Sequence, residues 1–169
     1  MRDSQRSAVY EAETLVRTMF DRADQRGTRS VEVLGSTITL PVERKFGSVE
    51  SVQTYCNQVL SLNWVVEFWP RASASVVVRA RAGNTAAHYS NNTIAVPDDR
   101  DGRWALRELV VLHELAHHLG NSDSDSDSDE ASHGPEFVDR YLSLVGEIIG
   151  PEAAFVLRAM FLAGGVQSS

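Results

Sequence analysis

The spacing of apolar residues along the chain predicts two helices in its first third. Between residues 5 and 26 apolar side chains recur every three or four positions, which is the spacing of one face of an amphipathic helix. Gly27 is expected to end this helix, because glycine readily adopts the left-handed conformation of a helix terminus. A second helix is predicted over 49–61, with Ser48 as its N-cap.

The C-terminal third of the chain shows the same periodicity after two Gly-Pro pairs. Proline is favoured at the first position of a helix, where its missing N–H is not needed. Gly134-Pro135 is therefore expected to open one helix with a long apolar stripe. Gly150-Pro151 is expected to separate it from a last short helix over 152–163.

Short runs rich in β-branched and aromatic residues predict five strands. These runs are Val31–Leu34, Thr37–Leu40, Ser75–Arg81, Ala86–Tyr89 and Thr93–Val96. The first two are expected to form a hairpin around Gly35-Ser36, and the last two a hairpin around Ser90-Asn91-Asn92.

The order of elements is typical of a single α+β domain. A helix and a hairpin come first, then a helix, further strands and three helices, and 169 residues suit one domain. The aromatic stretch Asn63–Pro70 is interpreted as core packing. We expect a small mixed or antiparallel sheet on which the helix over about 103–119 and the two C-terminal helices pack. Asp98, Asp99 and Asp101 are N-cap candidates for the helix over 103–119.

The helix predicted over 103–119 carries the sequence His113-Glu114-Leu115-Ala116-His117, an HExxH motif. On an α-helix the two histidines lie about 40° apart around the axis and about 6 Å along it, so both imidazoles can bind one ion. Apolar residues occupy the opposite side of the same helix: Leu112, Leu115, Ala116 and Leu119. The histidines are therefore expected to face a cleft.

Glu114 is predicted to be the general base of a hydrolytic site. It lies about 60° around the helix from His117, beside the metal rather than on it. A carboxylate there can take a proton from a water molecule that zinc has made acidic. His118 lies farther round the helix and is interpreted as a supporting or surface histidine, and His88 as a surface residue.

Catalytic zinc takes three protein ligands, so one more is needed, and three downstream residues qualify. His133 lies just before a helix, in the segment HGPEF. Asp123 completes the pattern HExxHxxGxxD, which resembles the aspartate variant of the metzincins in snapalysin-like proteases. Glu136, on the next helix, matches the arrangement of the gluzincins. His133 is preferred, because Asp123 opens a repetitive acidic tract in which no register is specified.

The pair of motifs HELAHH and HGPEF resembles the SprT-like zinc metallopeptidases and a group of small HExxHH metallohydrolases. The resemblance extends over about 93–145. It implies a zincin-like fold over 1–169 with a motif core at about 75–149. It also implies Zn²⁺ held by His113, His117 and His133, with Glu114 catalytic and Phe137 as the aromatic residue of the second motif.

Charge and composition narrow the range of partners. The net charge is −7, and residues 101–169 carry 12 acidic and only 4 basic groups. A nucleic-acid-binding surface should be basic, so nucleic acid is not an expected partner. No apolar run is long enough for a membrane span, no signal peptide is evident and there is one cysteine, so a cytoplasmic location is expected.

The tract Ser122–Glu130 repeats serine and aspartate and contains no apolar residue. It is expected to form a solvated, flexible loop over about 121–131. The sequence as a whole predicts a zinc metallopeptidase that acts on a protein or peptide. A zinc ion with a purely structural role, and an interaction module acting through the acidic tract, are the alternatives. The strand Thr93–Val96 is expected to have a free edge that aligns the substrate backbone.

Overall fold

The computed structural model describes residues 3–83, 86–120 and 132–169. Over these residues the chain forms six α-helices, two short 3₁₀ helices and two small sheets, which confirms the α+β class. The chain divides into two compact units. The terminal unit comprises Met1–Glu43 and Asp129–Ser169, and the central unit comprises Arg44–Ser128.

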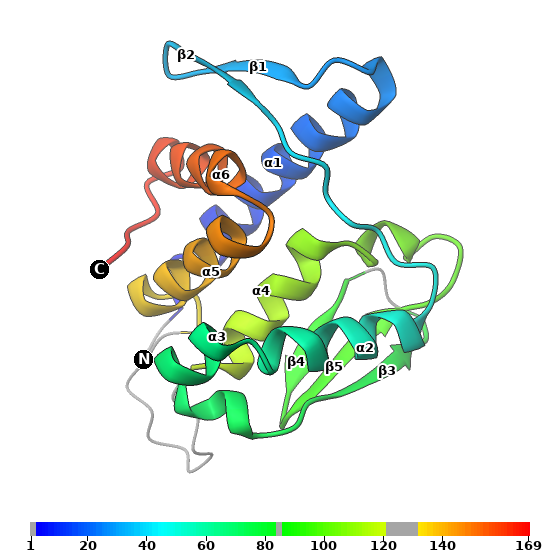
Figure 1. The fold of residues 1–169 in the computed structure, drawn as a ribbon. Helices are drawn as coiled ribbons and strands as arrows, with labels where there is room; N and C mark the ends of the chain where they lie inside the picture. The colour runs from blue at the N-terminus through cyan, green and yellow to red at the C-terminus, as the bar shows by residue number, and fades with distance from the viewer. Residues whose placement is uncertain (1–2, 84–85, 121–131) are drawn as a thin grey trace. The chain divides into compact units, whose positions relative to one another are not determined.

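The terminal unit is built from both ends of the chain (Figure 1). Helix α6 packs against both α1 and α5, and a two-stranded hairpin follows α1. The elements are α1 (Arg6–Arg26), β1 (Ser30–Val33), β2 (Ser36–Thr39), α5 (Pro135–Ile148) and α6 (Pro151–Ala163). All three predicted helices are confirmed, and Gly27 ends α1 with a φ of 66°.

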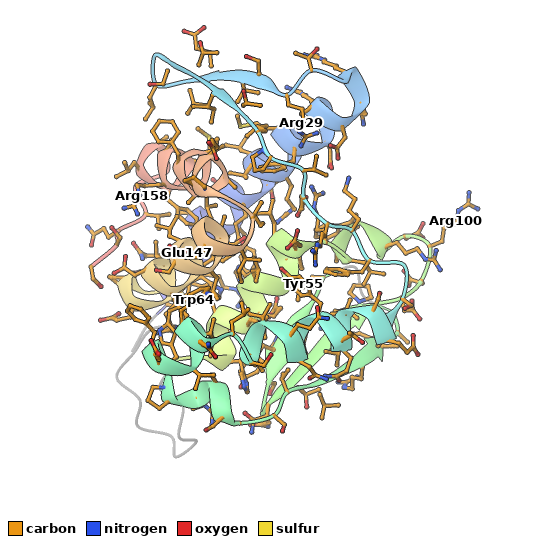
Figure 2. All side chains as sticks on the ribbon, in the orientation of Figure 1. Arg29, Tyr55, Trp64, Arg100, Glu147 and Arg158 are labelled. Atoms are coloured by element: carbon orange, nitrogen blue, oxygen red, sulfur yellow. The ribbon has the colours of Figure 1, made fainter. Side chains whose placement is uncertain are left out.

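The hairpin turn lies one residue earlier than the sequence suggested. Leu34 and Gly35 both have positive φ, 50° and 78°, and β2 begins at Ser36. Two consecutive positive φ values match the twist of a hairpin, so the turn consists of Leu34 and Gly35 instead of the expected Gly35 and Ser36. Arg29, labelled in Figure 2, donates hydrogen bonds to the carbonyls of Leu40 and Pro41 at 2.8 and 2.5 Å, which joins the two ends of the hairpin segment.

The central unit contains a three-stranded sheet with helices packed against it (Figure 1). Helix α2 packs against β3 and α4, and α4 packs against β4. The elements are α2 (Val49–Leu60), α3 (Asn63–Phe68), η1 (Pro70–Ser73), β3 (Val77–Arg81), β4 (His88–Ser90), β5 (Thr93–Pro97), η2 (Arg103–Ala105) and α4 (Glu108–His118). Ser48 caps α2 as expected, in a capping box with Ser51.

The sheet order is β3-β5-β4, with β5 parallel to β3 and antiparallel to β4. The predicted turn between β4 and β5 is confirmed, because Asn91 and Asn92 both adopt positive φ. The hypothesis that Thr93–Val96 has a free edge is wrong. Strand β5 pairs on both sides, so the edge next to the motif helix belongs to β4.

The motif helix begins later than predicted, at Glu108 rather than near 103. Residues 106 and 107 instead pair with residues 44–46, where Phe46 donates its N–H to the carbonyl of Leu106. Backbone groups engaged in this pairing cannot continue a helix. The prediction that Asp98, Asp99 or Asp101 caps the motif helix is wrong, because the N-cap of α4 is Arg107. Asp99 instead accepts a hydrogen bond from the N–H of Gly102, in the turn before η2.

The stretch Asn63–Pro70 is less buried than the sequence suggested. Val65 is fully buried, whereas Val66 and Phe68 are 51% and 73% exposed. A helix of only six residues turns one face to its neighbour α2 and leaves the other in solvent. The interpretation of the whole stretch as core is therefore wrong, and only one face of it is core.

The acidic loop predicted over about 121–131, including Asp123, lies outside the described residues. The single zincin-like domain over 1–169, with its motif core at about 75–149, stays a prediction. None of the helices within the described ranges has the length and apolar character needed to cross a membrane.

Candidate metal centre

The start of α4 is fixed by Glu108, a buried residue that is only 4% exposed. One oxygen accepts the hydroxyl of Tyr55 at 2.5 Å, and the other accepts the N–H of Arg44 at 2.7 Å. Tyr55, labelled in Figure 2, projects from α2. Burial of Tyr55 holds its pKa well above the usual range. The hydrogen bond to Glu108 and the negative charge of Glu108 raise this pKa further. Glu108 thus joins α2, the extended segment and the N-terminus of the motif helix.

Two histidines come together on α4. Nε2 of His113 lies 3.2 Å from Nε2 of His117, and the two rings meet edge to face with centroids 5.0 Å apart. The residues behind them, Leu112, Leu115 and Ala116, are fully buried, so the apolar side of the helix is core as expected.

The separation of the two nitrogens suits a shared ion. Imidazole nitrogens bind zinc at about 2.0–2.1 Å, so two of them on a tetrahedral ion lie about 3.3 Å apart. The observed 3.2 Å agrees with that spacing, and it is also compatible with an N–H···N hydrogen bond between the rings. His113 and His117 are therefore close enough to bind one metal ion.

The motif residues of α4 have little exposure to solvent. Every residue of the helix except the half-buried His117 is buried, including His113 and Glu114. The HExxH spacing by itself places the glutamate on the flank of the histidine pair, and here that flank is shielded. Glu114 is a buried carboxylate one residue after His113, a place where water access is restricted.

His118 is fully buried and has hydrogen bonds at both ring nitrogens. Nε2 lies 2.9 Å from the carbonyl of Ala74, and Nδ1 lies 3.1 Å from the hydroxyl of Tyr89. Because a carbonyl only accepts, Nε2 carries a proton and donates it to Ala74. Burial, and secondarily the charge of Arg71, lower the pKa of His118, while the bond to Ala74 opposes this. His118 is therefore a buried, structural side chain rather than a surface one.

Tyr89 links β4 to the histidines of the motif. Its ring lies parallel to that of His117, with a 10° angle between the planes and centroids 6.4 Å apart. It meets the ring of His118 edge to face. The hydroxyl that bonds His118 also lies 3.3 Å from Oδ1 of Asn92 in the β4–β5 turn. The last turn of α4 and this hairpin are therefore held together by side chains.

His133 belongs to the terminal unit. It is buried just before α5, and Nδ1 lies 2.7 Å from a carboxylate oxygen of Asp3. Gln5 donates a hydrogen bond to its carbonyl at 3.0 Å. The rings of Tyr10 and Phe137 lie against the imidazole, with centroids at 5.2 and 5.0 Å.

The other candidates differ from His133 in their surroundings. Glu136 is exposed in the first turn of α5, and His88 is exposed on β4, as expected for a surface residue. Asp123 lies outside the described residues.

Cys56 is fully buried, which raises its thiol pKa to about 12, as expected of a small buried hydrophobe.

Sequence reasoning did not identify Asp3, Gln5 or Tyr89 as neighbours of the histidines. Asp3 and Gln5 lie more than 120 positions from His133, and nothing in their local sequence marks them. Comparison with known proteins adds no such signal, since the chain matches no protein-family model, no curated protein and no solved structure.

Proposed function

We propose that the protein is a zinc-dependent hydrolase, most simply a peptidase. The observation that carries this proposal is the 3.2 Å separation of the His113 and His117 nitrogens on a helix that also holds a buried glutamate. This separation matches two ligands of one tetrahedral ion. The motif pair HELAHH and HGPEF, with its resemblance to the SprT-like metallopeptidases, supports a zincin-like interpretation.

His133 is proposed as the third ligand. A carboxylate at Nδ1 selects the tautomer with its proton on Nδ1 and its lone pair on Nε2, which is the form that binds metal. The rings of Tyr10 and Phe137 also pack against the imidazole of His133. The exposed Glu136 has no comparable environment among the described side chains, so His133 remains the preferred ligand.

Glu114 is proposed as the general base. Zinc at such a site supplies Lewis acidity toward a carbonyl and lowers the pKa of water to about 7. The carboxylate of Glu114 then accepts the proton of the attacking water and delivers it to the leaving amine. A buried carboxylate suits this role, because restricted solvent access keeps the proton between the reacting groups.

An extended peptide is the proposed substrate, and its proposed binding edge is β4. This strand is an edge of the described sheet and packs against α4, and its residues His88 and Ser90 are exposed. An extended chain can add to such an edge through backbone hydrogen bonds. A cytoplasmic setting is part of the proposal.

The test combines metal analysis with one substitution. Purified protein should contain one zinc per chain, and hydrolysis of a fluorogenic casein substrate should stop on removal of zinc. Glu114→Gln should keep the metal and lose at least about 100-fold in turnover, since general base catalysis contributes about 10²–10⁴. Protein without zinc, or a Glu114→Gln variant as active as the unmodified protein, would refute the proposal.

A structural zinc site is the second candidate function, and the burial of α4 favours it. Only His117 of the motif helix is partly accessible, whereas a catalytic ion must keep one position open to water. This alternative predicts bound zinc, no hydrolysis by the unmodified protein, and a Glu114→Gln variant that differs only in stability.

A further inference from the structure

We infer that Asp3 is the positioning residue of the metal site, acting through His133. This inference rests on the proposed role of His133 as the third ligand. It assigns a part of the site to the beginning of the chain, about 110 residues before the HExxH motif. Asp3 orients the ligand and does not itself contact the substrate.

The contact between the two side chains is direct. Oδ2 of Asp3 lies 2.7 Å from Nδ1 of His133, whose side chain is 6% exposed, while that of Asp3 is 22% exposed. At this distance a charge-assisted hydrogen bond forms, and it is stronger than one between neutral groups. A carboxylate accepts and cannot donate, so Nδ1 must carry the proton.

The consequence of this bond is a fixed lone pair on Nε2. Without a partner at Nδ1 a neutral imidazole exchanges between two tautomers, and its ring turns about the Cβ–Cγ bond. The carboxylate removes both freedoms and makes the ring a stronger electron donor. Losing such a partner typically weakens metal binding about 10- to 100-fold.

The backbone of His133 is held by a second contact from the same segment. Nε2 of Gln5 donates to the carbonyl of His133 at 3.0 Å and to the carbonyl of Gln167 at 3.2 Å. Oε1 of Gln5 accepts the N–H of Gln167 at 2.6 Å. One amide thus joins the histidine to the C-terminal segment, so both ends of the chain form the setting of this ligand.

The experiment measures Co²⁺ affinity of the full-length protein by chelator competition, with the visible spectrum of bound Co²⁺ as a second readout. Asp3→Ala should weaken binding about 10- to 100-fold and alter the spectrum. Asp3→Asn, which still offers an oxygen acceptor of the same shape, should lose less. Asp139→Asn is the matched control, because this carboxylate belongs to the same unit and accepts the backbone N–H of Ser169. The Co²⁺ affinity of the Asp139→Asn variant should equal that of the unmodified protein.

A double-mutant cycle separates positioning from a general effect on folding. If Asp3 acts through His133, Asp3→Ala should weaken Co²⁺ binding no further in a His133→Ala background. Equal losses in both backgrounds, or an Asp3→Ala affinity equal to that of the unmodified protein, would overturn the inference while leaving the proposed function intact. Unmodified protein that binds no Co²⁺, or a His133→Ala variant with full affinity, would overturn the proposed ligand set and the inference together.

Discussion

The surroundings of single residues in both units depend partly on local spacing and partly on contacts distant in sequence. His113 and His117 are neighbours because one helical turn separates them, so their proximity could be predicted from the motif alone. Tyr89 and Asp3 could not be predicted, because their positions beside His118 and His133 depend on packing between distant segments. Local periodicity contains no information about such pairs.

Cys56 should be unreactive in the folded protein. Burial raises its thiol pKa to about 12, so the thiol stays protonated at pH 8, and the thiolate is the reactive form. Ellman's reagent at pH 8 should therefore release less than about 5% of the expected thiolate in minutes, and one equivalent after unfolding in guanidinium. Rapid reaction of the native protein would show that this helix is not packed as described.

Removing Glu108 should destabilise the central unit strongly. Its carboxylate accepts from Tyr55 and from the N–H of Arg44, and both donors would lose their partner in Glu108→Ala. Each unsatisfied buried group costs about 1–3 kcal/mol, so we expect a loss of about 2–5 kcal/mol in chemical denaturation. Tyr55→Phe, which removes only one bond, should lose less. The exposed Glu67→Gln on α3 is the control and should change stability by less than about 0.5 kcal/mol.

At the scale of elements, the helices with a clear apolar stripe could be predicted closely, since burial of that stripe decides where they form. The limits of α4 could not, because the residues before Glu108 pair with residues 44–46, a contact between segments 60 positions apart. The central position of β5 was missed for a related reason. Strand β5 pairs with β3 in parallel, and β4 lies between these two strands in the sequence.

The first hairpin should be stabilised by a better turn sequence. Leu34 has a φ of 50° and a side chain that is 71% exposed, so a left-handed conformation is imposed on it with little packing in return. Leu34→Asn creates the Asn-Gly pair preferred in this turn and should raise stability by about 0.5–1 kcal/mol. Leu34→Val, with a β-branched side chain at positive φ, should lower it. Thermal unfolding measures both, and equal melting temperatures for the two variants would contradict the turn assignment.

At the scale of the whole molecule, the α+β class could be predicted from the order of the elements, whereas the division into two units could not. The terminal unit joins segments from both ends of the chain, and no glycine-rich or proline-rich linker marks the boundary at Glu43 and Arg44. Which helices share a core is decided by packing of complementary faces. A single sequence reveals the faces but not their partners.

The proposed ion should contribute to the stability of the folded chain. A ligand that binds only the folded state stabilises it by RT ln(1 + [L]/Kd), about 2.7 kcal/mol when free zinc exceeds Kd 100-fold. Chelation with EDTA should therefore lower the melting temperature of the zinc-loaded protein by several degrees. Glu114→Gln should show the same shift, because its carboxylate is not a proposed ligand. His113→Ala/His117→Ala should melt at one temperature with or without chelator. An equal EDTA effect on this double variant would mean that any stabilising ion is bound elsewhere.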